Sequence, residues 1–90
     1  MPTPLDHLEP DDSLRLQQLS RLMYETREHR RDVLAAAGAG DEEALLQAIL
    51  DRRMDEHPAY EHYLAARVLN QAHDSARQET NALLLHLNTQ

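Results

Sequence analysis

The residues of this chain that could bind a metal or move a proton are six histidines and 16 carboxylates. Three of the histidines, His57, His62 and His73, follow one another in the second half of the sequence. His62 and His73 share a helix face but lie about 16 Å apart along the axis, so they cannot bind one ion within one chain. His57 precedes Pro58 and is predicted to face solvent at the start of a helix. These three histidines therefore do not make a cluster.

A metal site between two helices is the alternative. Glu25 and His29 are one helical turn apart and face the same way. If His62 packs at the level of Glu25, the three side chains could bind Zn²⁺ or another divalent ion. The sequence contains neither an H-E-x-x-H motif nor the Glu-x-x-His pair of di-iron bundles. We therefore expect no metal and no cofactor, with Glu25, His29 and His62 as the ligands if a metal is bound.

Nucleophilic and phosphate-binding chemistry have little support. The chain has no cysteine, and none of its serines lies beside a histidine in a strand-turn-helix context. The segment AGAGD is too short for a phosphate-binding loop and has no lysine after it. An enzyme is therefore the less favoured interpretation.

Composition limits the partners. The formal net charge is −7, whereas a nucleic-acid binder normally carries a basic face, so no nucleic acid is expected. No apolar run approaches the length of a membrane span, and the first residues do not read as a secretory signal. All nine basic residues are arginine, a usage that suggests a GC-rich genome. We expect a small, acidic, cytoplasmic bacterial protein that contacts no membrane.

The elements that must position these residues are helices. The apolar residues are mainly leucine and alanine, which favour helix over strand. Gly38 should end a first helix, Asp41 should cap a second and Pro58 should open a third. The sequence therefore predicts an all-α chain with an irregular arm over 1–10 and one helical domain over 11–90. Its helices, in the order long, short, long, are expected at about 12–37, 41–56 and 58–88.

Two helices carry apolar faces at spacings of three and four residues. The predicted face of the first helix comprises Leu16, Leu19, Met23, Thr26, Arg30, Val33 and Ala37. The predicted face of the third comprises His62, Ala65, Leu69, Ala72, Ala76, Thr80, Leu83 and Leu87. Arg30 is the charged exception, and we expect it to reach the edge of the bundle or to pair with a carboxylate. Glu79 is a candidate partner, from the same chain or from another.

Helix lengths predict self-association. At 1.5 Å per residue the three helices are about 36, 24 and 44 Å long, so in an up-down-up arrangement the third overhangs by about 20 Å. An exposed leucine stripe on the overhang, at about residues 75–88, would mark an interface. The expected assembly is an intertwined or side-by-side homodimer, unless the tail frays or folds differently. Its predicted interface residues are Leu69, Ala72, Ala76, Leu83, Leu84 and Leu87.

The segment HYLAARVLNQAHDSARQETNALLLHLN and the long–short–long helix order resemble the all-helical chorismate mutases, which are intertwined dimers. The resemblance implies Ser75 and Glu79 as an active-site pair, Glu42 as a second-helix carboxylate and Arg30 as the residue that grips a substrate carboxylate. The chain departs from the family where an arginine is expected near Ser13 and a lysine after the first helix, because it contains no lysine.

Three functions remain, in order of preference. The first is a small acidic helical protein-interaction module of the regulator, chaperone or inhibitor type, which acts as a homodimer and binds another protein. The second is an enzyme like the all-helical chorismate mutases, using Arg30, Glu42, Ser75 and Glu79. The third is a metal-binding helical bundle.

Overall fold

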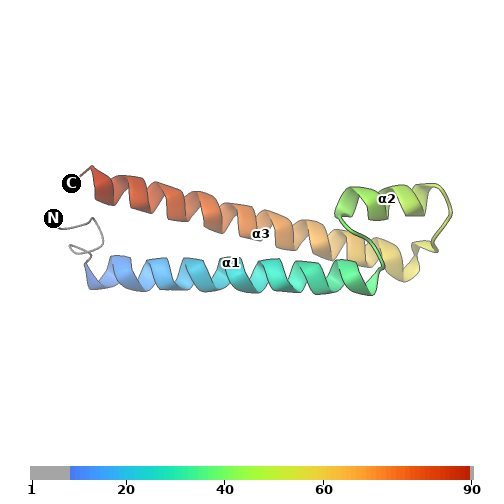
Figure 1. Ribbon diagram of the computed structural model, residues 1–90, viewed down its shortest axis with the longest axis horizontal. Coiled ribbons are helices and arrows are strands. Elements are labelled where there is room, and N and C mark those ends of the chain that lie inside the picture. Colours follow the sequence, from blue (N-terminus) through green and yellow to red (C-terminus); the bar gives the residue numbers. More distant parts are fainter. Residues whose placement is uncertain (1–8, 90) are drawn as a thin grey trace.

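A computed structural model describes residues 9–89 of the chain as three helices joined by two short loops. The helices are α1 (Pro10–Ala36), α2 (Glu42–Leu50) and α3 (Glu56–Asn88) (Figure 1). The predicted all-α chain with the order long, short, long is confirmed. Most of the predicted arm, residues 1–8, lies outside the described residues, and Pro10 is already the first residue of α1. No helix within the described range is long and apolar enough to cross a membrane.

The first loop follows the signals in the sequence. Gly38 is left-handed, with φ +71°, and its N–H donates to the carbonyl of Ala35 at 3.0 Å. The N–H of Ala39 donates to the carbonyl of Leu34, also at 3.0 Å, which completes a Schellman motif. Asp41 then caps α2, because its Oδ1 accepts a hydrogen bond from the N–H of Ala44 at 2.7 Å.

The second loop begins earlier than predicted. The second helix ends at Leu50 rather than at residue 56 because Arg52 takes a left-handed conformation, with φ 58°. The N–H of Arg53 donates to the carbonyl of Ala48 at 3.0 Å, so this end is a Schellman motif without a glycine. The third helix is regular from Pro58, and His57 before it has the extended backbone that a residue preceding proline favours.

The long helices form an antiparallel hairpin, and α2 lies beside the first turns of α3 (Figure 1). The particle is a rod of 58 × 18 × 18 Å. This differs from the expected up-down-up bundle, because α2 does not run back along α1. The extra length of α3 therefore lies at its N-terminal end, where α2 packs on it. Its C-terminal end lies beside the start of α1, so the predicted overhang at 75–88 is wrong for this chain.

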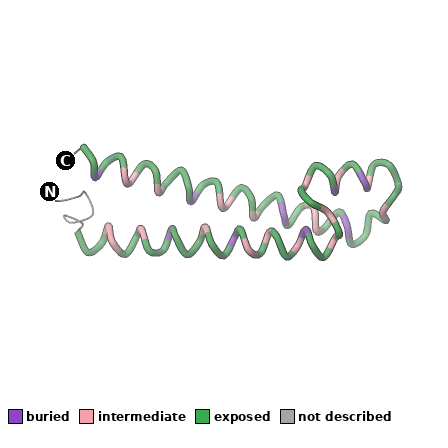
Figure 2. Tube along the Cα trace, in the orientation of Figure 1, coloured by how far each residue is buried: buried purple, intermediate pink, exposed green. Residues whose placement is uncertain are grey.

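The inner faces of the hairpin are largely as predicted. All seven predicted positions of α1 are buried or half-buried, and so are those of α3 except Ala65. Ala65 is exposed, whereas its neighbour Ala66 is buried. Figure 2 shows buried and half-buried positions recurring along both long helices. We call the end that α2 covers the closed end. Its core joins Leu34, Leu45 and Ala66 with Ala59, and the partly buried Tyr63 packs against them.

We call the other end, where only α1 and α3 pack together, the open end. Its buried residues are Leu19, Thr26, Ala76 and Leu87. Thr26 is accommodated because its hydroxyl donates to the carbonyl of Leu22 at 2.7 Å. Buried side chains are spaced two or three turns apart along each helix here, so the open end has a seam rather than a core.

Candidate functional site

Two of the predicted catalytic residues meet at the closed end. The Nη2 of Arg30 donates to Oε2 of Glu42 at 2.6 Å, and its Nε donates to the other carboxylate oxygen. The two side chains are only 29% and 16% exposed. This bidentate contact holds the pKa of Glu42 below its usual value and raises that of Arg30 above its own. Arg30 thus pairs with a carboxylate, as one alternative predicted.

The other two predicted catalytic residues lie elsewhere. Glu79 pairs with Arg15 across the open end, so it is not the partner of Arg30 in this chain. Arg15 and Arg30 are separated by about 22 Å along α1, from the rise per residue. Ser75 is exposed on α3. Within one chain, the Arg30–Glu42 pair therefore lies apart from Glu79 and Ser75, and the four candidates do not surround a common pocket.

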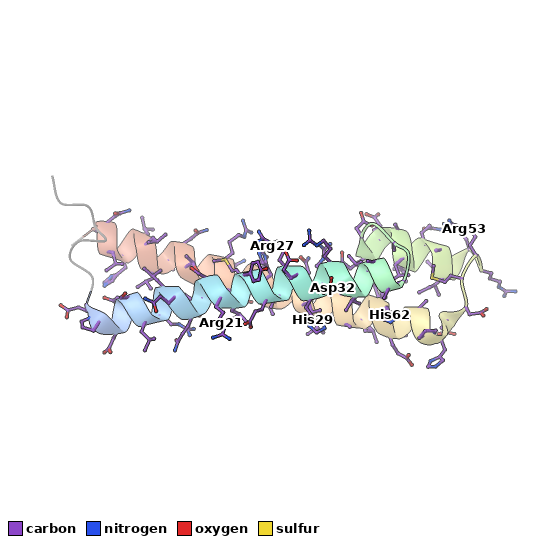
Figure 3. All side chains as sticks on the ribbon, turned by 60° about the horizontal axis from the view of Figure 1, so that its bottom comes forward. Arg21, Arg27, His29, Asp32, Arg53 and His62 are labelled. Carbon is purple, nitrogen blue, oxygen red and sulfur yellow. The ribbon has the colours of Figure 1, made fainter. Side chains whose placement is uncertain are left out.

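The alternative metal ligands are not brought together either. His62 lines a pocket with Ala36 at the end of α1, and Ala36 lies about 10 Å beyond His29 along that helix. Figure 3 shows His29 and His62 at different points along the rod. Glu25 accepts a hydrogen bond from Nε of Arg21 at 2.8 Å. Across residues 9–89, no three histidine or acidic side chains are grouped as metal ligands would be.

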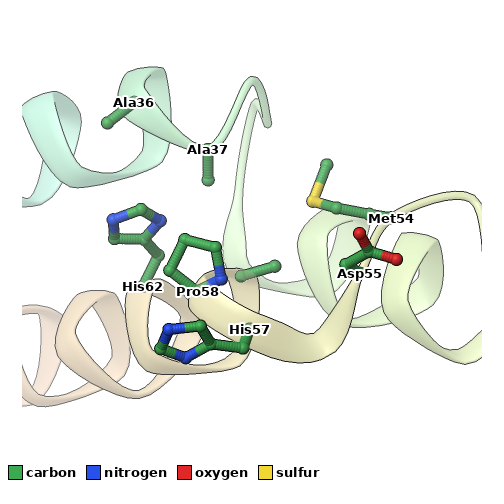
Figure 4. A pocket seen from close by; sticks show the side chains of 8 residues that line it. Ala36, Ala37, Met54, Asp55, His57, Pro58 and His62 are labelled. Atoms are coloured by element: carbon green, nitrogen blue, oxygen red, sulfur yellow. The ribbon is translucent and has the colours of Figure 1, made fainter.

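The pocket beside His62 is open and has a volume of about 320 Å³ (Figure 4). Its polar side chains are Asp55, His57 and His62, set among alanines, Met54 and a proline. The ring of His62 points toward the end of α1, whereas His57 lies on the far side of Pro58. Nδ1 of His57 is hydrogen-bonded to Glu61 at 2.8 Å. These groups do not converge on one point where a substrate could react.

The segment that holds α2 and its flanking loops, at the closed end, is acidic. Residues 41–61 carry seven carboxylates and two arginines. Of the seven, Glu42 is neutralised by Arg30, while Asp41 and Glu43 are exposed in the first turn of α2. The surface around α2 is therefore suited to contact with a basic group on another protein.

A row of exposed, uncharged residues lies on the side of α3 that faces away from α1. We call it the outer stripe. It comprises Tyr60, Leu64, Val68, Gln71, Ser75, Gln78, Ala82 and Leu85, all of which are exposed. Val68 and Leu85 are 62% and 66% exposed, and Tyr60 and Leu64 are each 41% exposed. Over about seven turns, the eight positions of the outer stripe carry no charged side chain, although exposed Arg67 lies at its edge.

The outward side of α1 differs. Its corresponding positions are Leu14, Gln18, Arg21, Glu25, Glu28, Asp32 and Ala35, of which four are charged. Glu28 is hydrogen-bonded to Arg31 of the next turn, as Glu25 is to Arg21. Charges paired in this way along a helix are typical of a face that stays in water. The outer stripe is therefore particular to α3.

Sequence reasoning missed the outer stripe because it assigned α3 a single apolar face. The available signal was a second run of three- and four-residue spacings without charge. Of the predicted dimer-interface residues, Ala76 and Leu87 are buried within the chain. Leu69, Ala72, Leu83 and Leu84 are half-buried.

Comparison with known proteins adds no family or neighbour. No protein-family model, curated protein or solved structure matches the chain. The functional inference below is therefore made from the geometry and the surface of the chain.

Proposed function

We propose that this chain is a non-catalytic helical interaction module that acts as a homodimer and binds another protein. The observation that carries the proposal is an elongated hairpin with an exposed, uncharged face along one of its helices. The radius of gyration is 17.8 Å, whereas a compact 90-residue domain has about 12 Å. Such a rod encloses few side chains and offers long surfaces for docking.

The exposed area supports this proposal. The chain exposes 6654 Å², against about 5,400 Å² for a compact monomer of its mass. The surplus of about 1,300 Å² exceeds the roughly 800 Å² that each partner contributes to a standard interface. A standard interface with a second copy would thus remove more than half of this surplus.

The polar groups support binding rather than catalysis. The most buried ion pair joins Arg30 to Glu42, so neither group is free to meet a substrate without breaking it. Arg15 and Glu79 also engage one another, in a pair that is half exposed. The acidic surface around α2 then serves a second protein with a basic face, as regulators, chaperones and inhibitors require.

One observation favours an enzyme like the all-helical chorismate mutases. Arg30 of α1 and Glu42 of α2 are in contact, and the resemblance places both residues in an active site. Adding the protein to chorismate and following the loss of its absorbance tests this second candidate. We expect no change above the uncatalysed rate, and a catalysed loss that disappears in Arg30→Ala would replace our proposal.

The mass in solution tests the first proposal. Light scattering or sedimentation equilibrium is required, because a rod elutes early from gel filtration whatever its mass. We expect about twice the chain mass of 10.3 kDa at micromolar concentration. A mass of one chain at every concentration up to the solubility limit would contradict the homodimer.

A further inference from the structure

We infer that the second copy docks along the outer stripe of α3, with the two α3 helices antiparallel and the two-fold axis passing between Gln71 and Ser75. This inference rests on the proposed homodimer and names the surface that forms it. The partner it commits to is a second copy of this chain, not a different protein.

The spacing of the stripe is the first argument. From Tyr60 to Leu85 the intervals are four, four, three, four, three, four and three residues. Intervals of this kind keep one helix face in contact with another helix over many turns. The third helix uses one such face against α1, and the outer stripe is a second that no part of residues 9–89 covers. At the closed end α2 packs near Tyr63 and Ala66, which leaves Tyr60 and Leu64 exposed.

The stripe is complementary to itself when reversed. An antiparallel pairing about its middle sets Tyr60 against Leu85 of the second copy, and Leu64 against Ala82. Val68 then meets Gln78, and Gln71 meets Ser75. Large side chains near one end thus meet smaller or flexible ones at the other. Parallel pairing would instead set Tyr60 against Tyr60 and Ala82 against Ala82, which leaves a crowded end and a gapped end.

The distribution of charge favours the same face, the outer stripe, and the same antiparallel direction of docking. Each copy carries a formal charge of −7, so a dimer must avoid bringing carboxylates together. The eight residues of the outer stripe are themselves uncharged, so their burial desolvates no charge. Antiparallel docking also keeps the two acidic 41–61 segments at opposite ends of the dimer, whereas parallel docking would place them side by side. The acidic surfaces therefore stay free for another partner.

Cysteine cross-linking tests the face and the direction together, because the natural chain has no cysteine. We would make Leu64→Cys and Ala82→Cys, singly and together, and treat each with a short bismaleimide. The two positions are about 27 Å apart along one α3, so the double variant cannot cross-link within a chain. A matched control on the outward side of α1 is Gln18→Cys with Asp32→Cys, whose sites are about 21 Å apart.

We expect the double variant, and an equimolar mixture of the two single variants, to give covalent dimers on a denaturing gel. Each single variant alone and the α1 control should stay at the mass of one chain. Self-linking of both single variants would overturn the antiparallel direction. Cross-linking of the α1 control, or a wild-type dimer whose stripe pairs do not react, would overturn the face but leave the proposed homodimer intact. A monomeric wild type would overturn both.

Discussion

The two ends of this rod are built from the same two helices and differ in what covers them. At the closed end α2 adds a third wall, so Leu45 and Leu34 are enclosed and the Arg30–Glu42 pair is mostly buried. At the open end α1 and α3 pack only on one another, and the Arg15–Glu79 pair is half exposed, at 49% for both side chains. In this chain, two helices alone bury scattered residues along a seam, whereas the addition of α2 joins the buried residues into a core.

Stability should therefore be graded along the rod. Segments with few buried apolar contacts open at lower cost than the core. Antiparallel docking of a second copy would bring the closed end of one chain beside the open end of the other. The assembly would then support the weaker end of each chain with the stronger end of its partner.

The largest effect separating the two ends is expected from leucine truncation. Leu45 and Leu19 are 0% and 1% exposed, so the comparison holds burial constant. We expect Leu45→Ala to lower the free energy of unfolding by about 3–5 kcal/mol and Leu19→Ala by about 2–3 kcal/mol, because the seam can close over a cavity and the three-helix core cannot. Urea unfolding followed by circular dichroism, at one protein concentration, measures both. Equal losses would remove the distinction between core and seam.

The ion pairs give the next contrast. Replacing Glu42 by Gln removes the charge from a mostly buried bidentate pair, and we expect a loss of about 1–2 kcal/mol. Glu79→Gln removes the same charge from a pair half in water and should cost no more than about 0.5 kcal/mol. A larger loss from Glu79→Gln than from Glu42→Gln would reverse the comparison.

The closed-end pair also predicts a pH dependence. Because the contact with Arg30 holds the pKa of Glu42 below its unfolded value, the folded state binds this proton less readily than the unfolded state. The contribution of Glu42 is therefore fully present above the unfolded carboxyl pKa of about 4.3, and it is lost as the pH falls through the folded pKa. Unfolding curves measured at neutral pH and at pH values below 4 give the free energy of unfolding at each pH. This free energy should fall less between the two conditions for Glu42→Gln than for the wild type. Parallel profiles would contradict this assignment.

The smallest contrast lies within one loop of the closed end. Gly38 has a φ of +71°, and a Cβ there would meet no atom within 4 Å, so only backbone strain opposes a side chain. We expect Gly38→Ala to cost about 1 kcal/mol. Gly40 is equally open but has no positive φ, and Gly40→Ala should be neutral or slightly stabilising. Thermal unfolding compares the stability of the two variants. A larger loss of stability for Gly40→Ala than for Gly38→Ala would be the contrary result.

Much of the secondary structure was predictable from the sequence because its signals are local. Gly38 and Asp41 mark the first loop through their backbone and capping preferences, and Pro58 marks where α3 becomes regular. The inner face of α1 follows from its periodicity. The early end of α2 was not predictable, because Arg52 takes a left-handed conformation for which glycine is the usual signal.

The tertiary arrangement was less accessible. The lengths of the helices do not reveal the direction in which the nine-residue α2 runs. The chain was therefore expected to fold up, down and up, with exposed leucines at the C-terminal end of its third helix. In the structure Leu87 at that end is buried within the chain. The partner of Arg30 was missed for the same reason, since Glu42 reaches it only from where α2 lies. The three- and four-residue spacing of the outer stripe could be seen in the sequence. The sequence alone does not show which of the two faces of α3 packs against α1.

The most direct test of the outer stripe is to introduce charged residues into it and to measure the mass of the protein in solution. Leu64→Glu with Val68→Glu places two carboxylates on the stripe, and Leu14→Glu with Tyr24→Glu adds the same charge to exposed positions of α1. Circular dichroism checks that both variants keep their helices, and sedimentation equilibrium gives the mass of each beside the wild type. We expect a dimer for the wild type and for the α1 variant, and a monomer for the α3 variant. A dimer that survives the α3 changes with its helices intact would contradict our assignment of the outer stripe.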